Sequence, residues 1–199
     1  MKYLKIKYTA PLLLAIGCLC FFIISCLKKP NEKNPACTGK DRWDVKTLTD
    51  LGELSINYTP INTTVNELIN IPLTNTINDN TPRFGIEFNT YSLKCRIREY
   101  KLSDDGDYHL VLEDIQNPSI TMVGEIPDEY CPSVQLSKHL SSFIKARTDF
   151  KQSLLSTAQV DTSVYTITGV AFYDKVHGQL GAAPNALEIH PILSISKRQ

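Results

Sequence analysis

The sequence of 199 residues lacks an excess of charge of either sign, with 21 basic and 21 acidic residues. Lys2, Lys5 and Lys7 precede an apolar run, so the chain after that run has 18 basic and 21 acidic residues, a net charge of −3. Such a domain has no broad electrostatic surface for a nucleic acid. The chain also has no Cys-x-x-Cys pair, zinc-ligand spacing, Gly-x-Ser-x-Gly, His-Glu-x-x-His or phosphate-binding loop. We therefore expect no cofactor and no metal site.

The N-terminus has the pattern of an export signal. Basic residues within 1–8 precede an apolar run over 11–25, which ends at Ile23-Ile24-Ser25-Cys26. This tetrapeptide resembles a bacterial lipobox, in which the cysteine becomes the lipidated first residue. We therefore expect a lipoprotein signal peptide over 1–25 and a polar tether over 26–36, with the protein anchored in the cell envelope, at the outer membrane, facing the periplasm or the exterior. The alternatives are an uncleaved transmembrane anchor and a soluble secreted form.

Three cysteines follow Cys26, so at most one disulfide forms among them. Cys95 alternates with Lys94 and Arg96 along a predicted strand, which places its thiol on the apolar face. Cys37 and Cys131 lie in polar or proline-containing segments typical of loops. We predict a Cys37–Cys131 disulfide and a buried, free Cys95.

Alternating apolar and polar residues predict strands, and helical spacing predicts one helix. In chain order the predicted elements are strands over 86–102, 108–113 and 120–126, a helix over 136–155, and strands over 164–174 and 186–195. This order is the connectivity of the OB-fold. We therefore expect a mainly β domain with one helix, an OB-fold-like five-stranded barrel over 86–199. The alternative is a β-sandwich.

Residues 37–85 are expected to form an irregular N-terminal arm that belongs to the same globular unit. Within it, 42–56 is predicted as a strand or irregular segment, and 64–69 as a short helix. The stretch 58–82 is rich in Asn, Thr and Pro and shows no clear periodicity.

Several motifs resemble those of a family of secreted, lipid-anchored bacterial proteins that is generally left as uncharacterised. The motifs are Arg42-Trp43-Asp44-Val45-Lys46-Thr47, Asp107-Tyr108-His109-Leu110-Val111-Leu112, Glu125-Ile126-Pro127 followed by Cys131, and the segment from His177 to Pro191. The resemblance covers about residues 37 to 195 and implies export and domain extent, but no chemistry.

The segment between the last two predicted strands, 175–185, holds the main candidates for a ligand site. It contains His177, Gln179 and Asn185 beside two glycines, and Glu188 and His190 follow on one face of the next strand. We expect these five residues to converge at one end of the barrel. Because an OB-fold binds ligands between the loop after its first strand and this one, they are candidate ligand-binding residues. The alternative is structural, with Glu188 paired to a strand arginine and the polar groups bonding the loop's own backbone.

Asp174 and His109 are second-tier candidates. With Glu188 and His190, Asp174 would form a cluster of carboxylate and imidazole groups that suits metal binding or acid–base chemistry. The turn acids Asp104, Asp105 and Asp107 match no standard calcium loop and are expected to be a solvated hairpin turn.

The function expected from these features is that of an exported, lipid-anchored envelope protein with a non-catalytic ligand-binding barrel. Its partners would be the membrane, through the lipid, and a small or polymeric ligand: an oligosaccharide, a nucleic-acid fragment or an envelope protein. The protein itself is expected to be a monomer. The alternative is an extracytoplasmic hydrolase, a nuclease or phosphodiesterase that uses a His/Asp/Glu cluster with an arginine such as Arg83 or Arg98.

Overall fold

A long strand with alternating side chains organises the fold. In the computed structural model, which describes residues 37, 41–154, 162–175 and 178–198, this strand is β2 (Asn89–Leu102). Tyr91, Leu93, Cys95 and Ile97 are buried in the main core, whereas the residues between them are more exposed. The strand expected over 86–102 is therefore confirmed from Asn89 onward. Its predicted start is wrong, because Gly85–Phe88 forms a 3-10 helix (η2).

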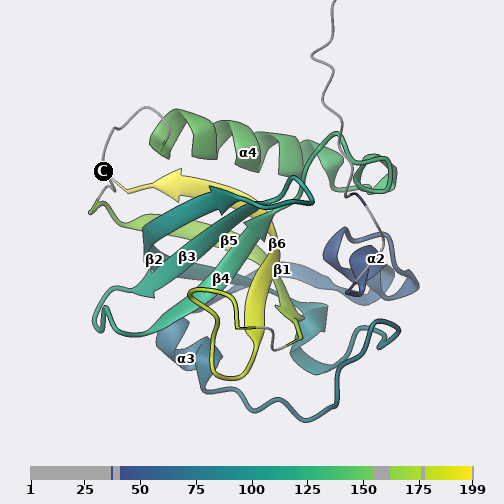
Figure 1. Cartoon of the computed structure of the whole chain (residues 1–199), viewed down its shortest axis with the longest axis horizontal. Coiled ribbons are helices and arrows are strands. Elements are labelled where there is room, and N and C mark those ends of the chain that lie inside the picture. The colour runs from purple at the N-terminus through teal and green to yellow at the C-terminus, as the bar shows by residue number, and fades with distance from the viewer. Residues whose placement is uncertain (1–36, 38–40, 155–161, 176–177, 199) are drawn as a thin grey trace, which may run out of the picture. The chain divides into compact units, whose positions relative to one another are not determined.

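Four further strands close a barrel around this core (Figure 1). They are β3 (Tyr108–Asp114), β4 (Thr121–Ile126), β5 (Tyr165–Tyr173) and β6 (Leu187–Lys197). The order β2-β3-β4-β6-β5 returns to β2, which pairs with β3 along its second half and with β5 along its first half. The β4–β6 pair is parallel and the other barrel pairs are antiparallel. The predicted OB-fold-like barrel is confirmed, and the β-sandwich alternative is not the architecture.

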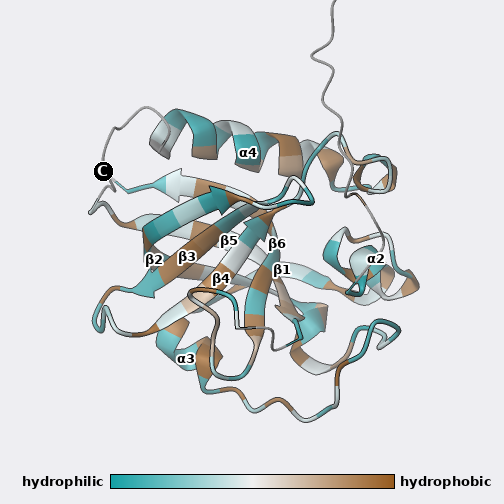
Figure 2. Ribbon diagram, viewed as in Figure 1, coloured by the Kyte–Doolittle hydropathy of each residue, from teal (hydrophilic) through white to brown (hydrophobic). Residues whose placement is uncertain are grey.

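One long helix, α4 (Leu140–Leu154), connects β4 to β5 and lies across the barrel in Figure 1. Phe143, Ala146 and Phe150 recur at helical spacing and are buried, which explains the helix expected over 136–155. The first turn of that prediction is wrong, because Val134–Leu136 forms a separate 3-10 helix (η3). Figure 2 shows hydrophobic residues in the middle of β3 and a mixture of hydrophobic and hydrophilic residues along α4.

The arm has more regular structure than its sequence indicates. It contains α2 (Trp43–Lys46), the 3-10 helix η1 (Leu51–Ser55), β1 (Asn57–Thr63) and α3 (Val65–Ile69). β1 extends the sheet by pairing in parallel with β2. The short helix expected over 64–69 is confirmed, and a capping box between Thr64 and Glu67 begins it. No strand forms over 42–56.

Two buried arginines fasten the arm to the barrel. Arg42 makes a bidentate ion pair with Glu87, with N···O distances of 2.7 and 2.6 Å, and also donates to the carbonyl oxygen of Tyr173 in β5. Arg83 pairs with Asp50 at 2.9 Å and donates to the carbonyl oxygen of Val45. These contacts hold α2 against the end of the barrel.

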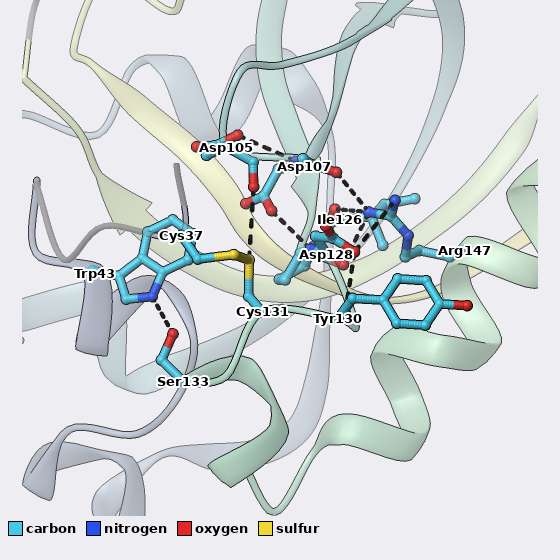
Figure 3. Close-up of a disulfide and its surroundings, with 12 residues drawn as sticks. Cys37, Trp43, Asp105, Asp107, Ile126, Asp128, Tyr130, Cys131, Ser133 and Arg147 are labelled. Carbon is cyan, nitrogen blue, oxygen red and sulfur yellow. Dashed lines mark hydrogen bonds and ion pairs between the residues drawn. A yellow bond between two sulfur atoms is a disulfide. The ribbon is translucent and has the colours of Figure 1, made fainter. Parts of the chain in front are cut away.

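The predicted disulfide between Cys37 and Cys131 is present, with the two Cα atoms 5.5 Å apart (Figure 3). Next to it, the indole nitrogen of Trp43 donates to Ser133 Oγ at 2.5 Å. Cys95 is free and fully buried, and burial raises the pKa of its thiol. The disulfide thus joins the start of the arm to the loop between β4 and α4.

Among the described residues, no helix is both long enough and apolar enough to cross a bilayer.

Candidate functional site

Polar side chains gather where β3 begins, β4 and β5 end, and β6 begins. Backbone pairing sets this arrangement: His109 of β3 pairs with Glu125 of β4, and Glu188 of β6 pairs with Phe172 of β5. Glu188 also pairs with Val123 in the parallel β4–β6 ladder. Four strands therefore bring distant parts of the chain to one end of the barrel.

The polar side chains lie on the outer face of the barrel wall. Leu110 and Ile189 belong to the main core, so their neighbours His109, Glu188 and His190 point the other way. All three are nevertheless buried, because the arm and the β5–β6 connection cover this face. A Cβ added at Gly181 in that connection would lie only 2.7 Å from a methyl group of Val111 on β3, so the connection packs closely on the wall.

A network of imidazoles and carboxylates forms there, which we name the buried cluster: Asp107, His109, Glu125, Glu188 and His190. Glu125 is its centre, with Oε1 at 2.8 Å from Nδ1 of His109 and Oε2 at 3.0 Å from Nδ1 of His190. On the other side of its ring, Nε2 of His190 lies 3.5 Å from Oδ2 of Asp107. Gln179 donates to Glu188 Oε1.

Burial and neighbouring charges set the ionisation of the cluster. Burial opposes ionisation of Glu125, but the imidazoles of His109 and His190 outweigh it and hold the pKa of Glu125 well below its usual value. Burial, together with the charges of Glu125 and Asp174, raises the pKa of Glu188 well above its usual value. Two carboxyl groups of the same type are thus driven in opposite directions.

Burial and neighbouring carboxylates act in opposite directions on the ionisation of His190. Burial lowers its pKa, but Asp107 and Glu125 prevail and raise it to about 9. The Asp107 carboxyl has a pKa raised to about 6, mainly by burial. The ring of His190 also meets the edge of Phe172, with centroids 5.7 Å apart.

Asp107 corrects an expectation from the sequence. It was expected in a solvated turn, and the turn itself is present, with the amide of Ser103 bonded to the carbonyl oxygen of Asp107. The Asp107 side chain, however, is fully buried and accepts the amide of Asp128 at 2.7 Å (Figure 3). Residue type predicts the turn, but only the fold shows that the side chain of its last acid is buried.

A pocket of about 490 Å³ opens over the cluster on the outer face of β3 and β4. We name it the outer-face pocket. Its floor includes His109 and Glu125, and Lys46 of α2 lies beside Asp174, with Nζ and Oδ1 3.8 Å apart. The remaining described lining residues are Asp41, Lys101, Leu102, Ser103, Asp104, Asp105 and Gln179. These residues come from the arm, from the end of β2 and the turn that follows it, and from the β5–β6 connection.

The structure brings together most of the residues that the sequence singles out. Glu188 and His190 belong to the cluster with His109, while Gln179 and Asp174 line the pocket. Glu188 contacts Gln179 rather than a strand arginine. Asn185 does not join them: its amide donates to the carbonyl oxygens of Leu68 and Ile71 in the arm. His177 lies outside the described residues.

Three members of this site are not predicted from the sequence: Glu125, Asp107 and Lys46. All three lie in motifs of the family resemblance, which implies no chemistry for them. The alternation of Glu125 with Gly124 and Ile126 in β4 is a signal that any outward strand residue gives. Comparison with known proteins adds no further residue, because no family model, curated protein or solved structure matches the chain.

Proposed function

We propose that this chain is an exported, lipid-anchored envelope protein whose barrel binds a polar ligand in the outer-face pocket without chemically transforming it. The observation that carries the proposal is the position of the pocket. It lies over β3 and β4, the second and third barrel strands, between the β2–β3 turn and the β5–β6 connection. OB-folds bind oligosaccharides and oligonucleotides on this face and with these loops.

The charge of the pocket favours one of these ligand classes. Five carboxylates line it, against two lysines and one histidine: Asp41, Asp104, Asp105, Glu125 and Asp174, with Lys46, Lys101 and His109. This balance repels a phosphate backbone and attracts positive charge. We therefore propose an oligosaccharide, with affinity increased by free amino groups on the sugar.

Binding is proposed in preference to hydrolysis because of the arginines. The hydrolase considered from the sequence would use an arginine to stabilise the charge on the phosphoryl oxygens. Arg83 is committed to Asp50, and Arg98 to Glu113 at 2.9 Å, so neither of these arginines serves the pocket. Among the described lining residues of the pocket there is no arginine.

Titration with three oligomers tests the ligand class. The full chain in detergent, kept in EDTA, should bind glucosamine tetramers in calorimetry, N-acetylglucosamine tetramers more weakly, and oligothymidylate not at all. Asp104→Lys reverses an exposed charge at the mouth of the pocket and should weaken glucosamine binding by about fivefold or more.

Asp149→Lys is the matched control, since Asp149 pairs with Lys145 on the exposed side of α4. It should leave binding unchanged. Equal affinity for oligothymidylate and glucosamine tetramers, or equal effects of the two substitutions, would contradict the proposed ligand and pocket.

Lipid anchoring is tested at Cys26, which lies outside the described residues. Cys26→Ala should abolish incorporation of labelled fatty acid and release the protein from membranes, because a cleaved lipoprotein has no other anchor. Cys18 lies within the apolar run over 11–25, and Cys18→Ala should have neither effect. Retention of the Cys26→Ala protein after alkaline extraction would show instead that the apolar run spans the membrane.

A further inference from the structure

Three side chains of the buried cluster are arranged as metal ligands are. Asp107, Glu125 and His190 each offer one ligand atom, and these atoms all lie within 4.8 Å of one another. They come from the β2–β3 turn, from β4 and from β6. Because these elements are held by the barrel, the three groups are preorganised rather than gathered by a mobile loop.

His190 has two close neighbours but no well-formed hydrogen bond. Neither ring nitrogen has a hydrogen-bond partner of good alignment, and Oδ2 of Asp107 has none either. The separation of 3.5 Å between Nε2 and Oδ2 is too long for a normal N–H···O bond. It is close to the separation of about 3.3 Å expected between two ligands of a tetrahedral Zn²⁺ ion, given metal–ligand distances of about 2.0–2.1 Å.

Polar atoms buried without partners are rare and call for an explanation, such as an ion. The cluster has a further buried polar atom of this kind, because Oε2 of Glu188 has no hydrogen-bond partner. Glu188 is 2% exposed, and the charge of Glu125 acts on its carboxyl group, so its unpartnered oxygen belongs to the same cluster. The cluster therefore contains more carboxylate oxygens than its own donors satisfy.

Both carboxylates among these three residues, those of Glu125 and Asp107, are also oriented by a second contact. His109 occupies Oε1 of Glu125 at 2.8 Å, which leaves Oε2 facing His190. The amide of Asp128 occupies Oδ1 of Asp107 at 2.7 Å, which leaves Oδ2 facing His190 from the other side. Metal ligands in proteins are usually fixed in this way by outer contacts.

We propose that Asp107, Glu125 and His190 bind a divalent transition-metal ion, Zn²⁺ in preference to Mn²⁺, at the floor of the outer-face pocket. One imidazole with two carboxylates is a ligand set that zinc accepts, and such sites bind zinc more tightly than manganese. The ion reaches the site past Glu125, which lines the pocket. Asp41, Asp104 and Asp105 remain at the mouth for a second ligand.

This inference rests on the proposed function only because both use the same pocket. Different experiments test the two proposals, so either one can be disproved without the other. Titration of Zn²⁺ without sugar tests the ion, whereas the oligomer titrations in EDTA test the pocket without an ion. The full chain in detergent, stripped with EDTA and then dialysed, should bind one Zn²⁺ per chain in calorimetry with micromolar or lower Kd. The Tm should rise by about 5–10 °C when free Zn²⁺ is about 100 times Kd.

Variants distinguish this site from other histidines. His190→Gln and Asp107→Asn should each weaken Zn²⁺ binding by more than about 100-fold, and the positioning variant His109→Gln by about 10- to 100-fold. The control is His139→Gln, because His139 also pairs with a carboxylate, Glu53 at 2.9 Å, and should bind zinc as the wild type does.

Circular dichroism should show that each variant is folded before titration. For a variant that does not fold, the decision rests on the wild type and on His109→Gln. The proposal is overturned if the wild type shows neither a Zn²⁺ isotherm nor a rise in Tm. It is equally overturned if folded His190→Gln or folded His109→Gln binds Zn²⁺ as tightly as His139→Gln does.

Discussion

Arg42→Met is expected to lower the free energy of unfolding by about 3–5 kcal/mol, because it leaves the Glu87 carboxylate buried without its cation. Glu87 is 0% exposed, and both of its oxygens receive the guanidinium of Arg42. Two backbone amides, from Phe84 and Tyr173, also donate to Glu87 but bring no full positive charge. Denaturant unfolding followed by circular dichroism measures the loss, and the Tm should fall by roughly 6–20 °C.

A surface arginine provides the matched control for this effect. The side chain of Arg98 is 42% exposed and pairs with Glu113 on the barrel wall. Solvent weakens such a pair, so Arg98→Met should cost no more than about 1 kcal/mol. The double variant Arg42→Met/Glu87→Met should recover part of the loss, because no uncompensated charge then remains. Similar losses for Arg42→Met and Arg98→Met would show that the arm is not held by this ion pair.

The barrel is predictable from the sequence because its information is local. In β2, Leu93, Cys95 and Ile97 alternate with charged residues, and in α4, Phe143, Ala146 and Phe150 follow the helical period. Six elements in the right order then leave few topologies open, and the OB connectivity is among them. The boundaries shift by a few residues only where a 3-10 turn, such as Gly85–Phe88, replaces the end of a predicted element.

The arm is not predictable in the same way, because its structure depends on contacts with the barrel. β1 carries Pro60 and is exposed at most positions, so it shows no alternation. It becomes a strand because β2 offers it an unpaired edge, and a proline is tolerated at such an edge. α2 has four residues, too few to show a helical period, and Arg42 and the disulfide hold it in place.

In the candidate site too, local sequence identifies some residues and only the fold identifies the others. Glu188 and His190 are identified from their spacing on one strand, and His109 from its place at the start of another. Glu125, Asp107 and Lys46 are missed, although each lies in a motif of the resemblance, because residue type and spacing do not mark them as site residues and only the closed barrel brings them together. Asn185 is a polar loop residue like Gln179, but it bonds the arm, a difference that residue type does not reveal.

The Cys37–Cys131 bond is expected to contribute about 4–5 kcal/mol, because it joins residues 94 positions apart and so removes much chain entropy from the unfolded state. The Cys37→Ala/Cys131→Ala variant should therefore unfold at lower denaturant concentration than the wild type. Reduction of the wild-type protein isolates the bond from the change of side chain and should produce a similar loss. The arm should suffer first, since Arg42 and Trp43 are then its main remaining attachments near Cys37. A loss below about 1 kcal/mol in both experiments would show that these contacts already confine the arm without the covalent link.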